Sequence, residues 1–497
     1  MMPKMMVVAS MSLVATLLLA GRSGFADAAG GPTIYVSYSA VNSPLGAIPG
    51  PGVSGMQVQN LDPVLDAQVV ADFYKQDGSA PVTINRPNLA AGSAGNFYFP
   101  TEQSLSNGVY AGVVSADRPI AAIVRTDWYS SGGSAIYGNL LPGQEVFAPL
   151  VAKGYGGQAS YVTIQNTDTS QPTEVSIEFR AAGVSGGMVK ATKTIARGTS
   201  VTVDLQRDPD FAAVPLGSLG SMVVRSAGAP VDLQVFTDTG NHKAVHAYEG
   251  LPLQRAATRL YAPLIRNDLA GTTGISVVNP GEVAVEVTVT YMASPLTPAC
   301  QGQVKHGGRS FTVAARGSAV FYQGNVAGLP TGDSGLPRKC VGSAVIEAAG
   351  GPVVAVVVDA DLVRTANSAG AGTAAAYNAF ADADGGLKVA LPLFRKQHTN
   401  LQLSTGIQVM NIGASPANAV LAIKDHQGRA LPVGPDAQRT IPPLSAYTWI
   451  PSTITSLPVG SYGSATLTSD QPLVVIVNDA SSSGAWDAAI YSGIKAD

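Results

Sequence analysis

The chain has few of the residues that carry enzyme or metal chemistry. Its 497 residues include only two Cys, five His and three Trp, and charged residues make up 13%. Because ordinary soluble domains are about one-quarter charged, small polar residues must cover much of the surface, which is typical of an exported β protein. The formal net charge is −3. With no basic cluster that could neutralise several phosphates, the composition excludes nucleic acid as a partner.

A long apolar run stands at the N-terminus. Lys4 precedes an apolar stretch from Met5 to Ala20, and small residues that include Ala26-Asp27-Ala28 follow it. This order predicts a secretory signal peptide at residues 1–28. The stretch is shorter than the roughly 20 residues of a membrane-spanning helix, although an uncleaved anchor is the alternative. We therefore expect a protein that is secreted, extracellular or at the cell surface, with no stable membrane span.

The two cysteines are Cys300 and Cys340. In an exported chain, an isolated pair predicts one disulfide. Closing a loop of this length stabilises the fold by about 4 kcal/mol on the chain-entropy estimate. A metal site with two Cys ligands is the alternative, and it would need further ligands, of which His306 is the only His near in sequence.

One strand-like motif that ends in Asn occurs four times. The phrase "YVTIQN" ends at Asn166, and its counterparts are "SGMQVQN", "TGISVVN" and "TGIQVMN", which end at Asn60, Asn279 and Asn411. An alternating apolar run follows each Asn, as expected for a half-buried strand. An Asn side chain can bond to the backbone of its own turn. The motif is therefore interpreted as repeated scaffold, and the alternative is that the four Asn-bearing loops contact an extended polymer.

Other phrases repeat in the same order around this motif. Three of the four copies have an apolar-proline phrase upstream, "FAPLV", "YAPLI" or "ALPLF". Downstream, each copy has a turn phrase of the type "IARGTS", then two apolar runs, of which the second begins near a Pro. Each copy closes on a Tyr, at Tyr137, Tyr248, Tyr377 and Tyr491.

The repeats predict an all-β protein of four tandem immunoglobulin-like antiparallel β-sandwich domains after the signal peptide. Short runs rich in Val, Ile, Thr, Tyr and Phe alternate with Gly, Pro, Asn and Ser, and no helical periodicity interrupts them. Each repeat is large enough to bury a core alone, so we expect independent domains like beads on a string with short linkers. The predicted domains are repeat 1 at 32–140, repeat 2 at 146–250, repeat 3 at 259–380 with the disulfide and an insertion, and repeat 4 at 388–495.

The phrase "VTIQNTDTSQPTEVSIEF" is similar to the first strand pair of CARDB-like, adhesion-associated domains. More broadly, the chain resembles tandem bacterial immunoglobulin-like repeats of secreted and cell-surface proteins. The resemblance covers nearly the whole chain after the signal peptide. It implies export, a stalk-like or surface role and binding to polymers or cells, and it implies no catalytic residues.

Candidate metal and catalytic residues are weak. His242, His246 and Glu249 lie close in sequence, but His residues four apart bind zinc only when a helix places them on one face, and this segment is predicted to be a strand. Asp382 and Asp384 could be calcium ligands between repeats, or an ordinary polar linker. No repeated acid pair, nucleophile elbow or phosphate loop occurs. We therefore predict no catalytic residue, no metal and no cofactor.

The aromatic residues leave a binding role open. Trp128, Tyr129 and Trp486 are predicted in loops after strands, where their rings could stack on sugar faces. The alternative is that these rings cap domain cores. The sequence thus predicts a non-enzymatic structural or adhesive protein of the bacterial surface or matrix, whose partners are surface polymers or copies of itself. The alternative function is carbohydrate binding through the aromatic loops.

Overall fold

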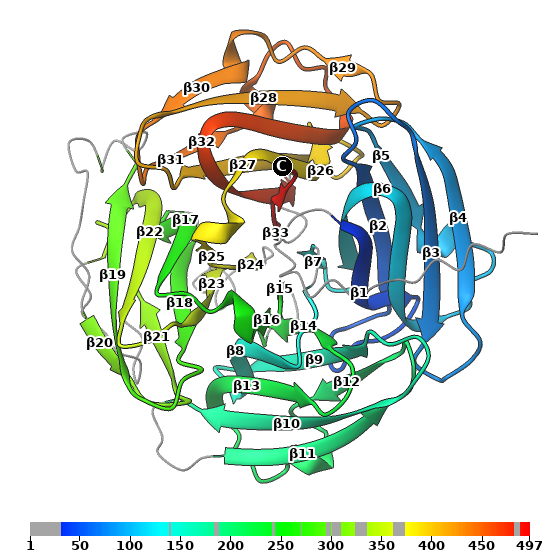
Figure 1. Ribbon diagram of the computed structural model, residues 1–497, viewed down its shortest axis with the longest axis vertical. Coiled ribbons are helices and arrows are strands. Elements are labelled where there is room, and N and C mark those ends of the chain that lie inside the picture. The colour runs from blue at the N-terminus through cyan, green and yellow to red at the C-terminus, as the bar shows by residue number, and fades with distance from the viewer. Residues whose placement is uncertain are drawn as a thin grey trace, which may run out of the picture.

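The computed structural model describes residues 31–138, 141–182, 188–240, 244–269, 271–294, 300, 310–323, 335–360, 373–481 and 488–497. These residues form an all-β protein, with short 3-10 turns and no α-helix among them (Figure 1). Four consecutive stretches are named units 1 to 4, at residues 31–138, 141–256, 257–384 and 385–497. The predicted signal peptide lies outside the described residues. Within them, no helix is long and apolar enough to cross a membrane.

Strands of units 1 and 2 pair antiparallel throughout. Unit 1 contains β1 (Gly31–Val41), β2 (Gly52–Asn60), β3 (Ala67–Lys75), β4 (Val82–Leu89), β5 (Ala94–Tyr98), η1 (Phe99–Thr101), β6 (Gly108–Trp128) and β7 (Gly133–Tyr137). Unit 2 contains β8 (Glu145–Tyr155), β9 (Gln158–Asn166), β10 (Thr173–Ala181), β11 (Met188–Ile195), β12 (Ser200–Asp204), η2 (Pro209–Phe211), β13 (Ser218–Ser226), β14 (Val231–Asp238), β15 (Val245–Glu249), β16 (Leu251–Pro252) and η3 (Leu253–Arg255).

Units 3 and 4 follow the same strand order. Unit 3 contains β17 (Arg259–Asn267), β18 (Thr272–Val278), β19 (Val285–Ala293), β20 (Ser310–Val313), β21 (Ser318–Tyr322), β22 (Cys340–Ala349), β23 (Val354–Ala360), β24 (Ala374–Asn378), β25 (Phe380–Ala381) and η5 (Asp382–Asp384). Unit 4 contains β26 (Gly386–Arg395), β27 (Leu403–Asn411), β28 (Ala417–Asp425), β29 (Ala430–Leu431), η6 (Gly434–Ala437), β30 (Gln438–Ile441), β31 (Ala446–Trp449), η7 (Pro451–Thr453), β32 (Tyr462–Ser481), β33 (Ala489–Ser492) and β34 (Ile494–Lys495).

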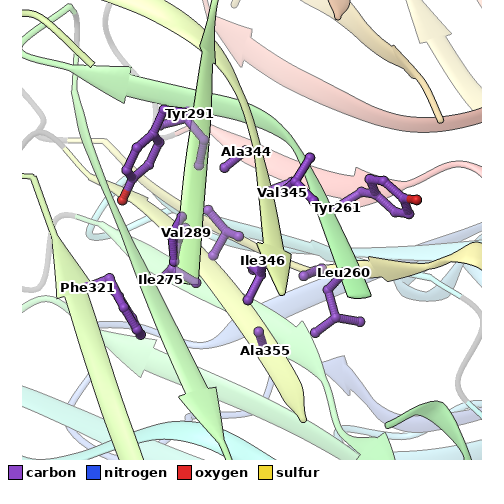
Figure 2. Close-up of a cluster of buried hydrophobic side chains, with 14 of the residues drawn as sticks. Leu260, Tyr261, Ile275, Val289, Tyr291, Phe321, Ala344, Val345, Ile346 and Ala355 are labelled. Atoms are coloured by element: carbon purple, nitrogen blue, oxygen red, sulfur yellow. The ribbon is translucent and has the colours of Figure 1, made fainter. Parts of the chain in front are cut away.

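Alternation of apolar and polar residues explains the strands. In β3, Val69 and Phe73 are buried while Gln68 is exposed, because successive side chains of a strand point to opposite faces. In unit 3 the strands form two sheets, one in the order β20-β19-β22-β17-β25 and one in the order β21-β18-β23-β24. Figure 2 shows Val289 and Ile346 of the first sheet close to Ile275 and Ala355 of the second, within one buried cluster. Apolar side chains from two sheets therefore make this core.

The predicted disulfide is confirmed. Cys300 and Cys340 are bonded, with Cα atoms 5.7 Å apart, and both are fully buried in the core of unit 3. The bond joins the insertion that makes unit 3 long to the start of β22.

The four units form a closed ring. The expectation of independent domains arranged in a row is therefore wrong. Strands β7, β15, β24 and β33 lie at the centre of the ring and contact one another in cyclic order (Figure 1). The residue before the closing Tyr of each central strand enters the core of the preceding unit. Ile136 packs in the core of unit 4, Ala247 in that of unit 1, Ala376 in that of unit 2 and Ile490 in that of unit 3. Each unit thus completes its neighbour's core.

The closing tyrosines fasten the first strand of each unit. That strand contains an irregularity in its pairing with a neighbouring strand of the sheet. In β17, for example, the irregularity in pairing with β22 lies between Ala262 and Ile265. A tyrosine hydroxyl donates to the carbonyl left unpaired there, and in units 2, 3 and 4 it also accepts the N–H of the same residue. The four pairs are Tyr137 with Tyr38, Tyr248 with Leu150, Tyr377 with Leu264 and Tyr491 with Leu393.

The Tyr248 hydroxyl is expected to contribute measurably to stability. Replacing Tyr248 by Phe leaves the partly buried N–H and carbonyl of Leu150 without the Tyr248 hydroxyl, so the free energy of unfolding should fall by about 1–3 kcal/mol. Urea denaturation measures this change. Tyr462→Phe is the matched control, since its half-buried ring stacks on His426 and the change should stay within about 0.5 kcal/mol. Equal effects of the two variants would contradict this role.

The repeated Asn is scaffold, as the sequence indicated. Asn166 is fully buried, its amide nitrogen donates to the carbonyls of Gln171 (2.7 Å) and Ile195 (3.3 Å), and its side-chain oxygen accepts the N–H of Asp168 (3.0 Å). The other three Asn residues make the same pattern of bonds. Because these amides are buried and hydrogen-bonded, they are not available to contact a polymer.

Candidate functional site

The candidate sites are pockets at one equivalent position between neighbouring units. The residue five places before the motif Asn lies on the strand that ends at or next to this Asn, which is β2, β9, β18 or β27, and it faces the preceding unit. It is Gly55 in unit 1, Tyr161 in unit 2, Gly274 in unit 3 and Gly406 in unit 4. Its neighbours across the sheet are equivalent too, since Gly55 pairs with Arg125, Tyr161 with Phe236, Gly274 with Val358 and Gly406 with Asn478. The side chains at these two positions decide whether each interface is filled or open.

The interface of units 1 and 2 is filled by aromatic rings. Tyr161 is 1% exposed, and its hydroxyl oxygen accepts the N–H of Ala47 at 3.0 Å. Its ring lies so close to Gly46 that a Cβ there would be 1.8 Å from it. Phe236 meets the rings of Tyr38 and Trp128 edge-on, at centroid distances of 4.8 and 6.0 Å. These aromatic rings therefore fill the part of the interface where they pack.

The interface of units 4 and 1 holds a polar pocket of about 100 Å³ around Gly55. Its walls carry the amides of Gln57 and Asn96 and the charged groups of Arg125, Asp127 and Arg395. The Tyr98 ring lies over Gly55, with which it pairs across the sheet.

The rim of this polar pocket is aromatic. Tyr98 is 40% exposed, and Tyr129, which is hydrogen-bonded to Tyr98, is 53% exposed. Burial of its hydroxyl, and then this hydrogen bond, raise the pKa of Tyr129. An aromatic face beside amides and charged groups is suited to a hydroxyl-rich ligand.

A buried ion network forms the floor of the polar pocket and joins the ends of the ring. The Asp479 carboxylate of unit 4 is fully buried and accepts hydrogen bonds from Arg125 of unit 1 and, at 2.9 Å, from Arg395 of its own unit. Arg125 also donates to Asp127 at 2.8 Å and to Ser134 at 2.8 Å. These bonds hold the guanidinium groups in place at the pocket.

The other two interfaces are also open. A pocket of about 100 Å³ between units 2 and 3 is mainly apolar and includes His246, Gly274 and Tyr322. A wider hollow of about 330 Å³ between units 3 and 4 includes Gly406, Gln408 and Ile450. Both pockets lie at the position equivalent to the one that Tyr161 fills between units 1 and 2.

A small axial cavity of about 60 Å³ lies where the central strands end. Glu249 lines it, and its carboxylate accepts the N–H of Gly138 at 2.5 Å and a bond from the amide nitrogen of Asn378 at 3.4 Å. Burial raises the pKa of Glu249. The carboxyl group therefore joins units 1, 2 and 3 at the axis.

The three aromatic residues predicted to face a ligand differ from one another in their burial and in whether the structure describes them. The prediction for Trp128 is wrong, because β6 extends to this residue and its ring is fully buried in the core shared by units 1 and 2. Tyr129 is exposed and is hydrogen-bonded to Tyr98, which lines the polar pocket. Trp486 lies outside the described residues. The third tryptophan, Trp449, is buried in unit 4 and donates to the carbonyl of Asp436 at 2.7 Å.

The described residues that were considered as metal ligands do not form one cluster. His246 lines the pocket between units 2 and 3, whereas Glu249 lines the axial cavity; His242 lies outside the described residues. Asp384 accepts the N–H of Ala381 at 2.7 Å and pairs with Arg255. Among the described parts of the chain, no three His, Cys, Asp or Glu side chains are grouped to hold a metal ion.

Sequence reasoning missed the inter-unit pockets. Their signal is the change from "SG" or "TG" to "SY" in the four copies of the Asn motif, which read as ordinary variation within a strand. A search against protein-family models finds no match, and a search of curated proteins finds none either.

Asp232 predicts a pH-dependent stability. It is 1% exposed in β14, and burial raises its pKa to about 8. The folded protein therefore keeps a proton that the unfolded chain releases, and stability falls as pH rises from about 4 towards about 8. Buried His246, whose pKa burial lowers to about 4, acts in the opposite direction only below its unfolded value of about 6.5.

Between pH 6.5 and 8, the free energy of unfolding should therefore fall by about 2 kcal/mol. Urea denaturation at a series of pH values measures the slope. Asp232→Asn is the control, and it should reduce the slope because the amide does not titrate, while Glu249, whose pKa burial also raises, keeps its own contribution. A flat profile for the unaltered protein would be inconsistent with a protonated Asp232.

Proposed function

We propose that this protein is a secreted, non-enzymatic adhesive protein of the bacterial surface or extracellular matrix, and that it binds polysaccharide in the pocket between units 4 and 1. The observation that carries the proposal is the pocket's composition, in which the exposed Tyr98 ring, hydrogen-bonded to exposed Tyr129, stands beside amide, guanidinium and carboxylate groups. Sugar rings offer apolar faces to aromatic side chains and hydroxyl groups to polar ones. A rigid ring would hold these groups in one arrangement and so lower the entropy cost of binding.

The same proposal takes each unit as an immunoglobulin-like sandwich related to the CARDB-like repeats, and residues 1–28 as a cleaved signal peptide. Support comes from the antiparallel sheets, the disulfide and the repeated strand order. The proposed division into four repeats is supported by the strands, which run from Gly31 to Tyr137, from Glu145 to Pro252, from Arg259 to Ala381 and from Gly386 to Lys495.

A purely structural fibre built by pairing of sheet edges is less favoured. Strands β4 and β11 lie at one edge of the sheets of units 1 and 2. Pro87 lies within β4, and β11 carries Lys190 and Lys193. Proline and lysine on an edge strand hinder pairing with another chain. These strands therefore favour ligand binding over self-assembly through their edges.

Glycan-array binding of the secreted protein tests the polysaccharide site. Tyr98→Ala should weaken binding to any retained glycan by more than about tenfold, the range of a lost aromatic contact. Ile450→Ala is the matched control, because Ile450 occupies the equivalent rim position between units 3 and 4 and is 49% exposed. Loss of binding in both variants, or in neither, would exclude the proposed pocket.

Cell fractionation tests the adhesive role separately. Antibody detection should find the protein on producing cells or in the matrix, and a polysaccharide that binds the pocket should release it in a wash. Protein found as fibres by negative-stain microscopy would instead support the structural alternative.

A further inference from the structure

The mainly apolar pocket between units 2 and 3 includes the imidazole of a buried histidine, His246. The pocket lies between Leu150 and Tyr155 of unit 2 and Gly274, Tyr322 and Val358 of unit 3. His246 lines the same pocket, is 2% exposed, and its Nδ1 atom has no hydrogen-bond partner. A buried ring nitrogen without a partner costs free energy, and a bound ligand can recover that cost.

His246 is specific to this unit. The equivalent residue, two places before the closing Tyr, is Ala135 in unit 1, Ala375 in unit 3 and Ala489 in unit 4. Burial lowers the pKa of His246 to about 4, so the imidazole is neutral near pH 7. One of its nitrogens then accepts a hydrogen bond and the other donates one.

The interface of units 1 and 2 shows what fits this position. There, Tyr161 takes the place of Gly274, and its phenol ring is buried in the same cluster as Ala135. The pocket beside Gly274 has a volume of about 100 Å³, which is on the scale of apolar cavities that hold a single aromatic ring.

We propose that the pocket between units 2 and 3 binds a small phenolic compound, whose ring takes the place that Tyr161 occupies between units 1 and 2 and whose hydroxyl group bonds to His246. The ring would lie against Leu150, Val358 and Tyr322. The hydroxyl would satisfy Nδ1, either by donating to it or by accepting from it. This site differs from the polysaccharide pocket in both position and chemistry, and it does not depend on that proposal.

Binding of p-cresol and toluene, which differ only in the hydroxyl group, tests the site. Ligand-observed NMR titration of the full protein should show saturable binding of p-cresol, about tenfold tighter than binding of toluene. In His246→Leu the preference should fall to about twofold or less. Absence of saturable p-cresol binding, or an unchanged preference in His246→Leu, would overturn the proposal.

A filled-pocket variant gives the second test. Gly274→Tyr supplies the ring that Tyr161 supplies elsewhere, and it should abolish p-cresol binding. A Cβ at Gly274 would lie 3.2 Å from the Tyr322 ring, so the protein must be shown to fold. Gly406→Tyr is the control, because a Cβ there has nothing within 4 Å and the variant should bind p-cresol normally. A folded Gly274→Tyr that still binds p-cresol would refute the site, and if this variant does not fold, the His246→Leu comparison decides.

Discussion

Replacing Phe236 by alanine should lower the free energy of unfolding by about 3–5 kcal/mol, the range for removal of a buried aromatic ring. Phe236 belongs to β14 of unit 2, but its ring meets Tyr38, Trp128 and Tyr137 of unit 1 edge-on. Since the core of unit 1 contains this ring, the substitution should destabilise both units. Trp128 fluorescence in a background that lacks the other two tryptophans reports unfolding of unit 1.

Phe179→Ala is the matched control for this experiment. Phe179 is 1% exposed and packs within the core of unit 2 itself. If the ring unfolds as one cooperative structure, Phe179→Ala should also shift the Trp128 transition. A Trp128 transition that neither variant shifts would show that unit 1 unfolds independently of unit 2.

The second large effect is expected at the closure of the ring. Asp479→Ala should cost about 3–5 kcal/mol, because it leaves buried Arg125 and partly buried Arg395 at the interface of units 4 and 1 without their shared carboxylate. Thermal and urea unfolding measure the loss. Asp359→Ala is the control, since Asp359 holds the equivalent position in unit 3 and pairs with Arg266 of the same unit at 3.1 Å.

A triple variant separates the charge from the packing. Arg125→Met and Arg395→Met with Asp479→Leu remove the shared carboxylate and both guanidinium groups that bond to it but keep apolar volume, and the variant should recover most of the stability lost in Asp479→Ala. Asp479→Ala should also loosen the contact of β7 with β33, seen as faster hydrogen exchange of Ile136, whereas Asp359→Ala should leave it unchanged. Equal exchange in both variants would mean that Asp479 does not hold the ring closed.

The local structure was predictable because its causes are local. Alternating apolar residues place the strands, and Asn166 bonds to the backbone of its own turn. The disulfide was predictable because the chain has only two Cys and was expected to be exported. The closing tyrosines were visible as a repeat, although their partners were not, because an irregularity in strand pairing leaves no pattern in the sequence.

The ring was not predictable, because a residue that completes a neighbour's core looks like one that completes its own. Phe236 and Ile136 look in the sequence like other apolar residues of a strand, and every residue of their strands β14 and β7 is buried. Trp128 was misplaced for a related reason, since a position after the strand was expected and β6 in fact continues to it. The pockets depend on which of the four equivalent positions carries glycine, and only the ring shows that these positions face another unit.

Small-angle X-ray scattering of residues 31–497 tests the closed ring most directly. A compact body of this length should have a radius of gyration of about 23 Å, whereas four domains in a row should exceed about 40 Å. We expect the smaller value, unchanged on dilution. A value near the larger one would contradict the ring and, with it, the pockets between the units.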